Sequence, residues 1–148
     1  MRTIFKDSSL QELFDEQGYV VVSSLLKDQT VRELIEIYNE AYPGNLDPGF
    51  HCTLYYDSYD QKKMVNDEVN RVLTPIVSNW LENYRPIVVD YPVKGAHTEG
   101  DVAMHQDWSF VDEKKHISLN IWIPLIDVTK ENGAYFVLKG SNKIAHTI

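Results

Sequence analysis

Apolar residues in the first part of the chain recur at helical spacing and predict two short helices near the N-terminus. Ser8 or Ser9 is the expected N-cap of the first helix, and Gly18 is its expected end. Asp28 is the expected cap of the second helix, which stops at Pro43-Gly44. Between the two helices, the β-branched run over residues 19–22 predicts a short strand.

A third and longer helix is predicted from about Asn66 to Tyr84, where apolar residues again recur at intervals of three and four. Pro75 lies inside this range and removes one backbone hydrogen bond, so a kink is expected there. Residues 45–60 are rich in Gly, Pro, Asp and Tyr and show no period, and we expect them to form a loop.

After Arg85 the pattern changes to short runs that alternate between apolar and polar residues or are rich in β-branched residues, as is typical of strands. The predicted strands are residues 87–89, 102–108, 116–123 and 134–138. Helices followed by strands indicate an α+β fold. We therefore expect a single domain, with a helical N-terminal region over residues 1–85 and a β-sandwich or barrel over residues 86–148.

The predicted strand at residues 116–123 has two different faces, because successive side chains of a strand point to opposite sides. One face is apolar: Ile117, Leu119, Ile121 and Ile123. The other face is polar apart from one tryptophan: His116, Ser118, Asn120 and Trp122. Such a face either meets solvent or lines a wet cavity. Trp122 favours the cavity, because a tryptophan is costly to expose and its indole N–H can donate to a carboxylate.

Composition narrows the classes of function. The chain has 148 residues, 43% of them hydrophobic, with a net charge of −8 and no basic stripe, which argues against nucleic-acid binding. Cys52 is the single cysteine, so a disulfide framework is excluded and a reducing compartment is favoured. No run of residues approaches the ~18 apolar residues of a membrane span. We therefore expect a cytoplasmic protein with no membrane partner.

His105 and Asp107 are the main candidates for chemistry. Residues two apart on an extended backbone share a face, with Cα atoms roughly 6.5–7 Å apart, so the imidazole and the carboxylate can look into one cavity. Together they make two thirds of the 2-His-1-carboxylate triad that holds Fe(II) and leaves positions open for oxygen and an organic co-substrate. Taken alone, the tripeptide is weak evidence, because His-x-Asp is more often an ordinary surface His–Asp pair.

Several segments, in the order in which they occur along the chain, resemble the phytanoyl-CoA dioxygenase family, which consists of Fe(II)- and 2-oxoglutarate-dependent oxygenases. The matching segments are FDEQGYVVV at residues 14–22, HQDW at 105–108, SLNIWIPLIDVT at 118–129, ENGA at 131–134 and KGSNK at 139–143. The resemblance spans residues from about 10 to 145. It is far more specific than the His-x-Asp tripeptide, because these motifs occur in the family's order and at fitting spacing.

The resemblance implies a double-stranded β-helix, or jelly roll, flanked by N-terminal helices. It also implies that His105 and Asp107 are iron ligands and that Trp122 lies near the co-substrate 2-oxoglutarate. Asn120, on the same strand face as Trp122, is a further candidate contact for that co-substrate. A carboxylate at position 107 favours hydroxylation, because the halogenases of the family lack that carboxylate. The implied partners are O2 and a small organic substrate that no residue here identifies.

The chain departs from the family pattern in two ways. The family has a second histidine ligand on a later strand, followed by an arginine that pairs with 2-oxoglutarate, whereas no arginine follows Arg85 here. After Asp107 the histidines are His116 and His146, and His146 is either the third ligand or a solvated tail residue. In addition, a jelly roll needs eight strands, and only about half of them are predicted here.

We therefore expect the chain to be the front part of a longer enzyme, to be completed by a missing C-terminal part or by a second chain. The alternative is a non-catalytic jelly-roll binding or interaction module, or an inactive fragment that lacks the distal histidine and arginine.

Overall fold

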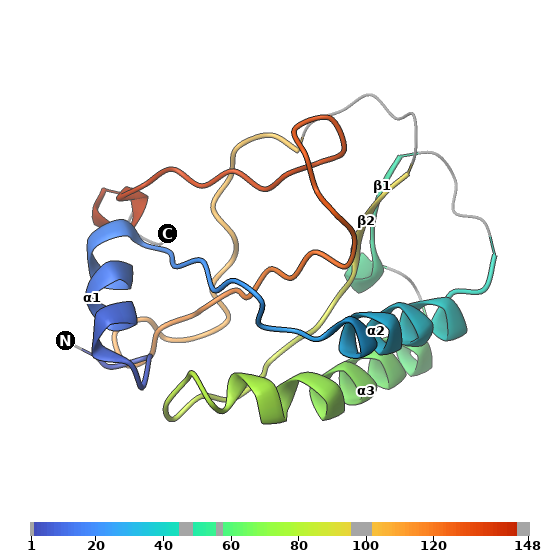
Figure 1. Ribbon diagram of the computed structural model, residues 1–148, viewed down its shortest axis with the longest axis horizontal. Coiled ribbons are helices and arrows are strands. Elements are labelled where there is room, and N and C mark those ends of the chain that lie inside the picture. Colours follow the sequence, from blue (N-terminus) through green and yellow to red (C-terminus); the bar gives the residue numbers. More distant parts are fainter. Residues whose placement is uncertain (1, 45–48, 56–57, 96–101, 145–148) are drawn as a thin grey trace.

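The computed structural model describes residues 2–44, 49–55, 58–95 and 102–144. These ranges contain the α-helices α1 (Ser8–Gln17), α2 (Asp28–Ala41) and α3 (Tyr59–Val77), shown in Figure 1. Strands β1 (Phe50–Cys52) and β2 (Pro92–Lys94) pair antiparallel, with His51 opposite Val93. Two 3₁₀ turns complete the elements, η1 (Thr53–Tyr55) and η2 (Ser141–Lys143).

Helix α1 begins and ends through specific capping contacts. The Asp7 carboxylate is the N-cap and accepts from the backbone N–H groups of Ser9, at 2.7 Å, and Leu10, at 3.2 Å. The predicted caps Ser8 and Ser9 are wrong, because the helix already includes both residues. Gly18 ends the helix in the left-handed conformation, with φ +82°, which confirms the predicted C-terminus.

Helix α2 has the predicted length but a different cap. Its N-cap is Lys27, which makes no side-chain capping bond, and Asp28 is the first helical residue. The prediction of Asp28 as the cap is therefore wrong by one position. Its carboxylate still lies in the first turn, where the positive end of the helix dipole favours a negative charge.

Helix α3 lies seven residues further toward the N-terminus than predicted, at 59–77 rather than 66–84. The Ser58 hydroxyl caps it by accepting from the N–H of Gln61 at 3.3 Å, and Pro75 lies in its last turn. With β1 and η1, the start of α3 replaces much of the loop predicted over 45–60. Among the described residues, no helix is both long enough and apolar enough to cross a membrane.

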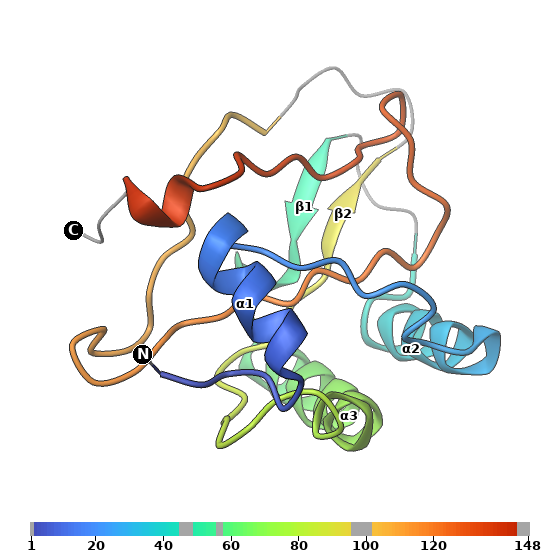
Figure 2. The ribbon, with the colours of Figure 1, turned by 60° about the vertical axis from the view of Figure 1, so that its left-hand side comes forward.

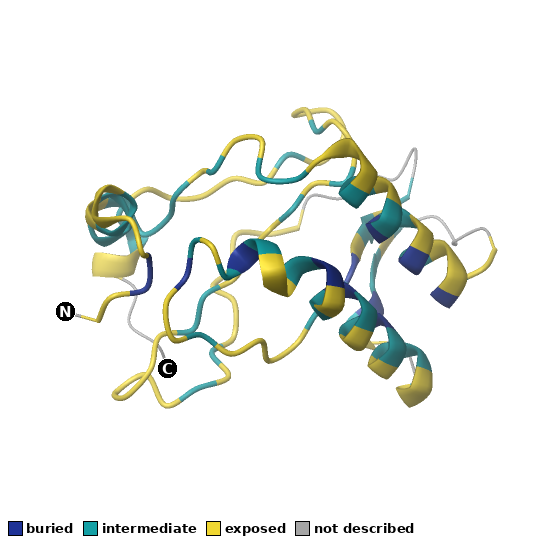
Figure 3. Cartoon of the chain, turned by 60° about the horizontal axis from the view of Figure 1, so that its bottom comes forward, coloured by how far each residue is buried: buried dark blue, intermediate teal, exposed yellow. Residues whose placement is uncertain are grey.

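The main core lies between α2, α3 and the β1–β2 pair (Figures 1 and 3). Its buried members are Leu34, Ile37, Ala41, Val65, Val69, Val72 and Tyr91. Tyr91 connects the layers, because its hydroxyl donates to the Leu34 carbonyl of α2 at 2.8 Å. Its backbone N–H donates to the buried Thr53 hydroxyl at 2.8 Å.

A second core joins the N-terminal arm to the far end of α3. Ile4, Phe5, Val77 and Leu81 are buried there, and Leu119 packs against them. Figures 1 and 2 show α1 beside the η2 turn, where the Gly140 N–H donates to the Gln17 carbonyl at 2.8 Å. Two segments far apart in the sequence therefore meet at the end of α1.

The strands predicted at 19–22, 87–89, 102–108, 116–123 and 134–138 are not formed within the described residues. These segments are extended, but no ladder of backbone hydrogen bonds joins them. An alternating pattern predicts which side of an extended backbone each side chain faces. A strand also needs a neighbouring segment in register to share its backbone hydrogen bonds, and the pattern does not predict that neighbour. The fold is therefore mixed α and β, with a single small sheet in the described ranges. The predicted jelly roll is not seen there.

Candidate functional site

His105 and Asp107 converge, as their spacing predicted, although the backbone between them forms no strand. The imidazole Nε2 lies 3.2 Å from the Asp107 Oδ1. Both side chains are accessible, with 54% and 45% of their surface exposed. An extended backbone brings residues i and i+2 to one side with or without a pairing partner, so the convergence does not depend on a sheet.

The hydrogen bond on the other ring nitrogen fixes how His105 presents itself. The Nδ1 atom lies 2.8 Å from the Ala103 carbonyl, which can only accept, so Nδ1 carries the hydrogen. In the neutral ring, Nε2 then holds a lone pair that faces a carboxylate oxygen. Two lone pairs in that arrangement need a cation between them, either a proton or a metal ion. Correspondingly, the Ala103 carbonyl and then the Asp107 charge raise the pKa of His105.

Asn120 fixes the carboxylate in the same manner. Its side-chain Nδ2 donates to the Asp107 Oδ2 at 2.6 Å, which leaves Oδ1 directed at the imidazole. His105 is thus held through Nδ1 and Asp107 through Oδ2, which leaves Nε2 and Oδ1 available to a cation. Outer partners of this kind orient metal ligands and are costly to remove.

The pair fits a metal ion as two of its ligands. First-row metals bond imidazole nitrogen and carboxylate oxygen at about 2.0–2.2 Å, so two ligands at right angles lie about 3 Å apart, close to the observed separation. Among the described residues, however, no group of three His, Cys, Asp or Glu side chains could hold a metal. His116 lies in a separate turn, where its carbonyl accepts from Arg2 at 2.6 Å. His146 falls outside the described residues.

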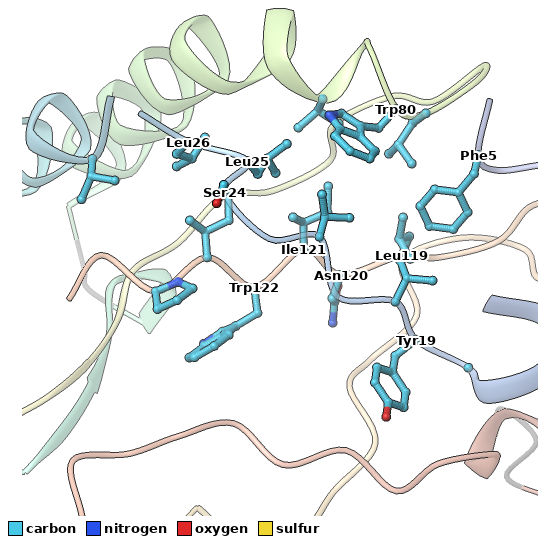
Figure 4. Close-up of a pocket in the computed structure, with 18 residues that line it drawn as sticks. Phe5, Tyr19, Ser24, Leu25, Leu26, Trp80, Leu119, Asn120, Ile121 and Trp122 are labelled. Carbon is cyan, nitrogen blue, oxygen red and sulfur yellow. The ribbon is translucent and has the colours of Figure 1, made fainter. Parts of the chain in front are cut away.

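Trp122 lies two residues beyond Asn120, and both side chains point to the side opposite Ile121 (Figure 4). The predicted alternation of this segment therefore holds at these positions. Trp122 is 41% exposed and stacks on the ring of Tyr135, with centroids 5.3 Å apart and planes inclined by 25°. Burial and, after it, the charge of Asp107 raise the pKa of Tyr135.

Sequence reasoning did not select Tyr135. The signal available was weak, namely an aromatic residue two positions after the Asn132-Gly133 turn in a segment expected to pair. Nothing in that pattern says which residue the ring would meet. The contact with Trp122 joins segments from two different predicted strands, and only the folded chain reveals it.

A hollow of about 400 Å³ adjoins Asn120 and Trp122 (Figure 4). It is lined by Phe5, Gly18, Tyr19, Val20, Val22, Ser24, Leu25, Leu26, Val31, Val77, Trp80, Leu81, Leu119, Asn120, Ile121, Trp122, Ile123 and Pro124. The sequence left open whether the Asn120–Trp122 face meets solvent or a cavity. Both apply, because these two side chains are exposed and also border this largely apolar hollow.

No curated protein and no solved structure matches the chain. The family model described as phytanoyl-CoA dioxygenase (PhyH) matches residues 14–147, and this range contains every segment on which the resemblance rested, His105-Gln106-Asp107 and Trp122 included. On the evidence of a match over nearly its whole length, the chain belongs to the phytanoyl-CoA dioxygenase family.

Proposed function

We propose that the protein works as an Fe(II)- and 2-oxoglutarate-dependent oxygenase that hydroxylates a small organic substrate, with His105 and Asp107 as two of the iron ligands. Membership of the family supports the type of reaction. The observation that carries the assignment of ligands is the 3.2 Å approach of His105 Nε2 to Asp107 Oδ1, with the opposite atom of each side chain already bonded elsewhere.

The bound iron and 2-oxoglutarate would supply the oxidising chemistry, and the chain supplies placement. His105 offers Nε2 because Ala103 holds its Nδ1–H, and Asp107 offers Oδ1 because Asn120 holds its Oδ2. Trp122 borders the hollow described above, and its indole N–H is a donor suited to a carboxylate of the co-substrate. These residues need little rearrangement to receive a cation, which lowers the entropic cost of binding one.

The proposed donor set needs a third protein ligand and a cation for the far carboxylate of 2-oxoglutarate. The third ligand would be His146, which lies outside the described residues, or a residue of a second chain, and the cation would likewise come from outside the described ranges. The alternative, a binding module without catalysis, is favoured by one observation, that two ligands and no third occur within the described residues.

Anaerobic titration with Fe(II), followed by calorimetry, tests the ligand assignment. Asp107→Ala should weaken iron binding by at least about tenfold, because loss of a ligand costs at least as much as loss of an outer partner. Asp67→Ala is the matched control, since Asp67 is a similarly exposed aspartate on α3 that pairs with Lys63. Equal iron affinity in Asp107→Ala and in the unsubstituted protein would refute the assignment.

A second measurement separates the enzyme from the module. Succinate formation from 2-oxoglutarate in the presence of Fe(II) and O2, abolished in Asp107→Ala but not in Asp67→Ala, supports the oxygenase. Iron binding that depends on Asp107, without any succinate, supports the module.

A further inference from the structure

Tyr135 reaches the neighbourhood of the His105–Asp107 pair from a different part of the chain. Its ring stacks on Trp122 with the centroids 5.3 Å apart. Trp122 lies in the same extended segment as Asn120, whose amide holds the Asp107 carboxylate. A continuous series of contacts thus runs from the Tyr135 ring to one of the proposed metal ligands.

The turn that precedes Tyr135 is firmly built. Asn132 closes it with two side-chain bonds, because its amide oxygen accepts from the Thr129 N–H at 2.5 Å and its amide nitrogen donates to the Asp127 carbonyl at 2.7 Å. The Ala134 N–H then donates to the Thr129 carbonyl at 2.9 Å, and Gly133 adopts φ +107°. Tyr135 follows directly, so a hydrogen-bonded turn leads the backbone to the position from which its ring meets Trp122.

The neighbouring residue does not share this role. Phe136 is an aromatic residue of similar size, but 73% of its surface is exposed, compared with 52% for Tyr135. Successive residues of an extended segment point to opposite sides, so the two rings face different surroundings. The chain therefore contains a matched pair of aromatic positions, one in the Trp122 stack and one exposed beside it.

We propose that Tyr135 is a positioning residue of the metal site, which acts by stacking on Trp122 and so holds the Asn120 segment against Asp107. This inference rests on the proposed function, since it assumes that Asp107 is a metal ligand. Aromatic stacking stabilises a pair of rings beyond the effect of area burial, and the contact therefore orients an indole that is otherwise half exposed. The phenol hydroxyl is not needed for this role, because the contact is between ring faces.

The test measures Co(II) affinity by calorimetry together with near-ultraviolet circular dichroism, using the full chain. The dichroic signal that disappears in Trp122→Phe identifies the stacked indole. Tyr135→Leu should lose the same signal and bind Co(II) about tenfold more weakly, the lower end of what loss of an outer partner costs. Tyr135→Phe keeps the ring and should retain both the signal and the affinity. Phe136→Leu should leave both unchanged.

The outcomes separate this inference from the proposed function. If Asp107→Ala abolishes Co(II) binding while Tyr135→Leu binds Co(II) normally, the role of Tyr135 is overturned and the metal site stands. If Asp107→Ala binds Co(II) normally, both fall together. Equal losses of affinity in Tyr135→Phe and Tyr135→Leu also overturn the inference, because the ring alone would then not suffice. If Tyr135→Leu does not fold, Tyr135→Gln replaces it, because glutamine breaks the stack and suits an exposed position. Normal Co(II) binding by Tyr135→Gln would then overturn the role of Tyr135.

Discussion

Replacing Gly18 by alanine should destabilise the protein more than the same change at any other described glycine. Gly18 ends α1 with φ +82°, and its N–H donates to the Phe14 carbonyl at 2.7 Å. A Cβ there would lie 2.8 Å from the Asn142 Oδ1 and 3.1 Å from the Asn142 Cβ. The first contact is with a side-chain tip, but the second is next to the backbone, so the η2 turn itself would have to move.

The cost has two parts. A left-handed alanine costs about 1–2 kcal/mol. About 0.4–1 kcal/mol of this returns through the smaller conformational freedom of the unfolded chain. Displacing the tightly packed Asn142 adds about 1–3 kcal/mol. We therefore expect Gly18→Ala to lower the free energy of unfolding by about 3 kcal/mol, the midpoint of a range from about 1 to 4.6 kcal/mol.

Urea unfolding followed by far-ultraviolet circular dichroism measures this loss through the midpoint and slope of the transition. Gly140→Ala is the control, because Gly140 has a similar φ of +78° but open space where its Cβ would lie, so only the backbone cost of about 1 kcal/mol applies. Asn142→Gly removes the obstructing side chain and should recover most of the difference when combined with Gly18→Ala. If Gly18→Ala costs no more than Gly140→Ala, the reasoning about this contact is wrong.

Two further predictions concern the main core and the β1 strand. Thr53→Val should cost about 1–3 kcal/mol in urea unfolding, because it leaves the Tyr91 N–H without the buried hydroxyl that accepts it, whereas Thr74→Val on the exposed side of α3 should change little. Burial, followed by the hydrogen bond to Asp90, raises the pKa of the Cys52 thiol from 9.0 to about 11, so below pH 9 the native thiol should be alkylated about a hundredfold more slowly than in urea. Since the unfolded thiol ionises at a lower pH than the native thiol, Cys52 contributes stability that is complete below pH 9 and lost as the pH rises to about 11. Equal alkylation rates in the native and unfolded protein would rule out the raised pKa.

The helices were largely predictable from the sequence, because their signals are local. The apolar spacing and the glycine at position 18 identified α1, and Pro43-Gly44 marked the end of α2. The N-caps were missed by one or two residues, because Ser8 and Ser9 can cap a helix as well as Asp7, and Asp28 is a better capping residue than Lys27. The early start of α3 was missed because residues 60–63 are all polar, so the apolar spacing that marks a helix begins only at Met64 and Val65.

The extended segments show what alternation can and cannot predict. It correctly placed His105 beside Asp107, and Asn120 on the same side as Trp122, because both follow from the geometry of an extended backbone. It did not predict the missing ladders, since pairing depends on a partner segment rather than on local pattern. The Trp122–Tyr135 stack was beyond reach for the same reason.

The docking of the Gly140 turn on the end of α1 has a consequence for how the chain matures during synthesis. The bond between Gly140 and Gln17 closes a loop of 123 residues, the difference between the two positions, at an entropic cost of about 4 kcal/mol. This loop can close only after the ribosome has released the Gly140 turn. Until then the last carbonyls of α1 are hydrated, whereas α2 and α3 can already pack together. The entropic cost of closure grows only logarithmically with loop length. An insertion in a connecting loop would therefore delay this closing step far less than a substitution that disrupts the Gly140 turn.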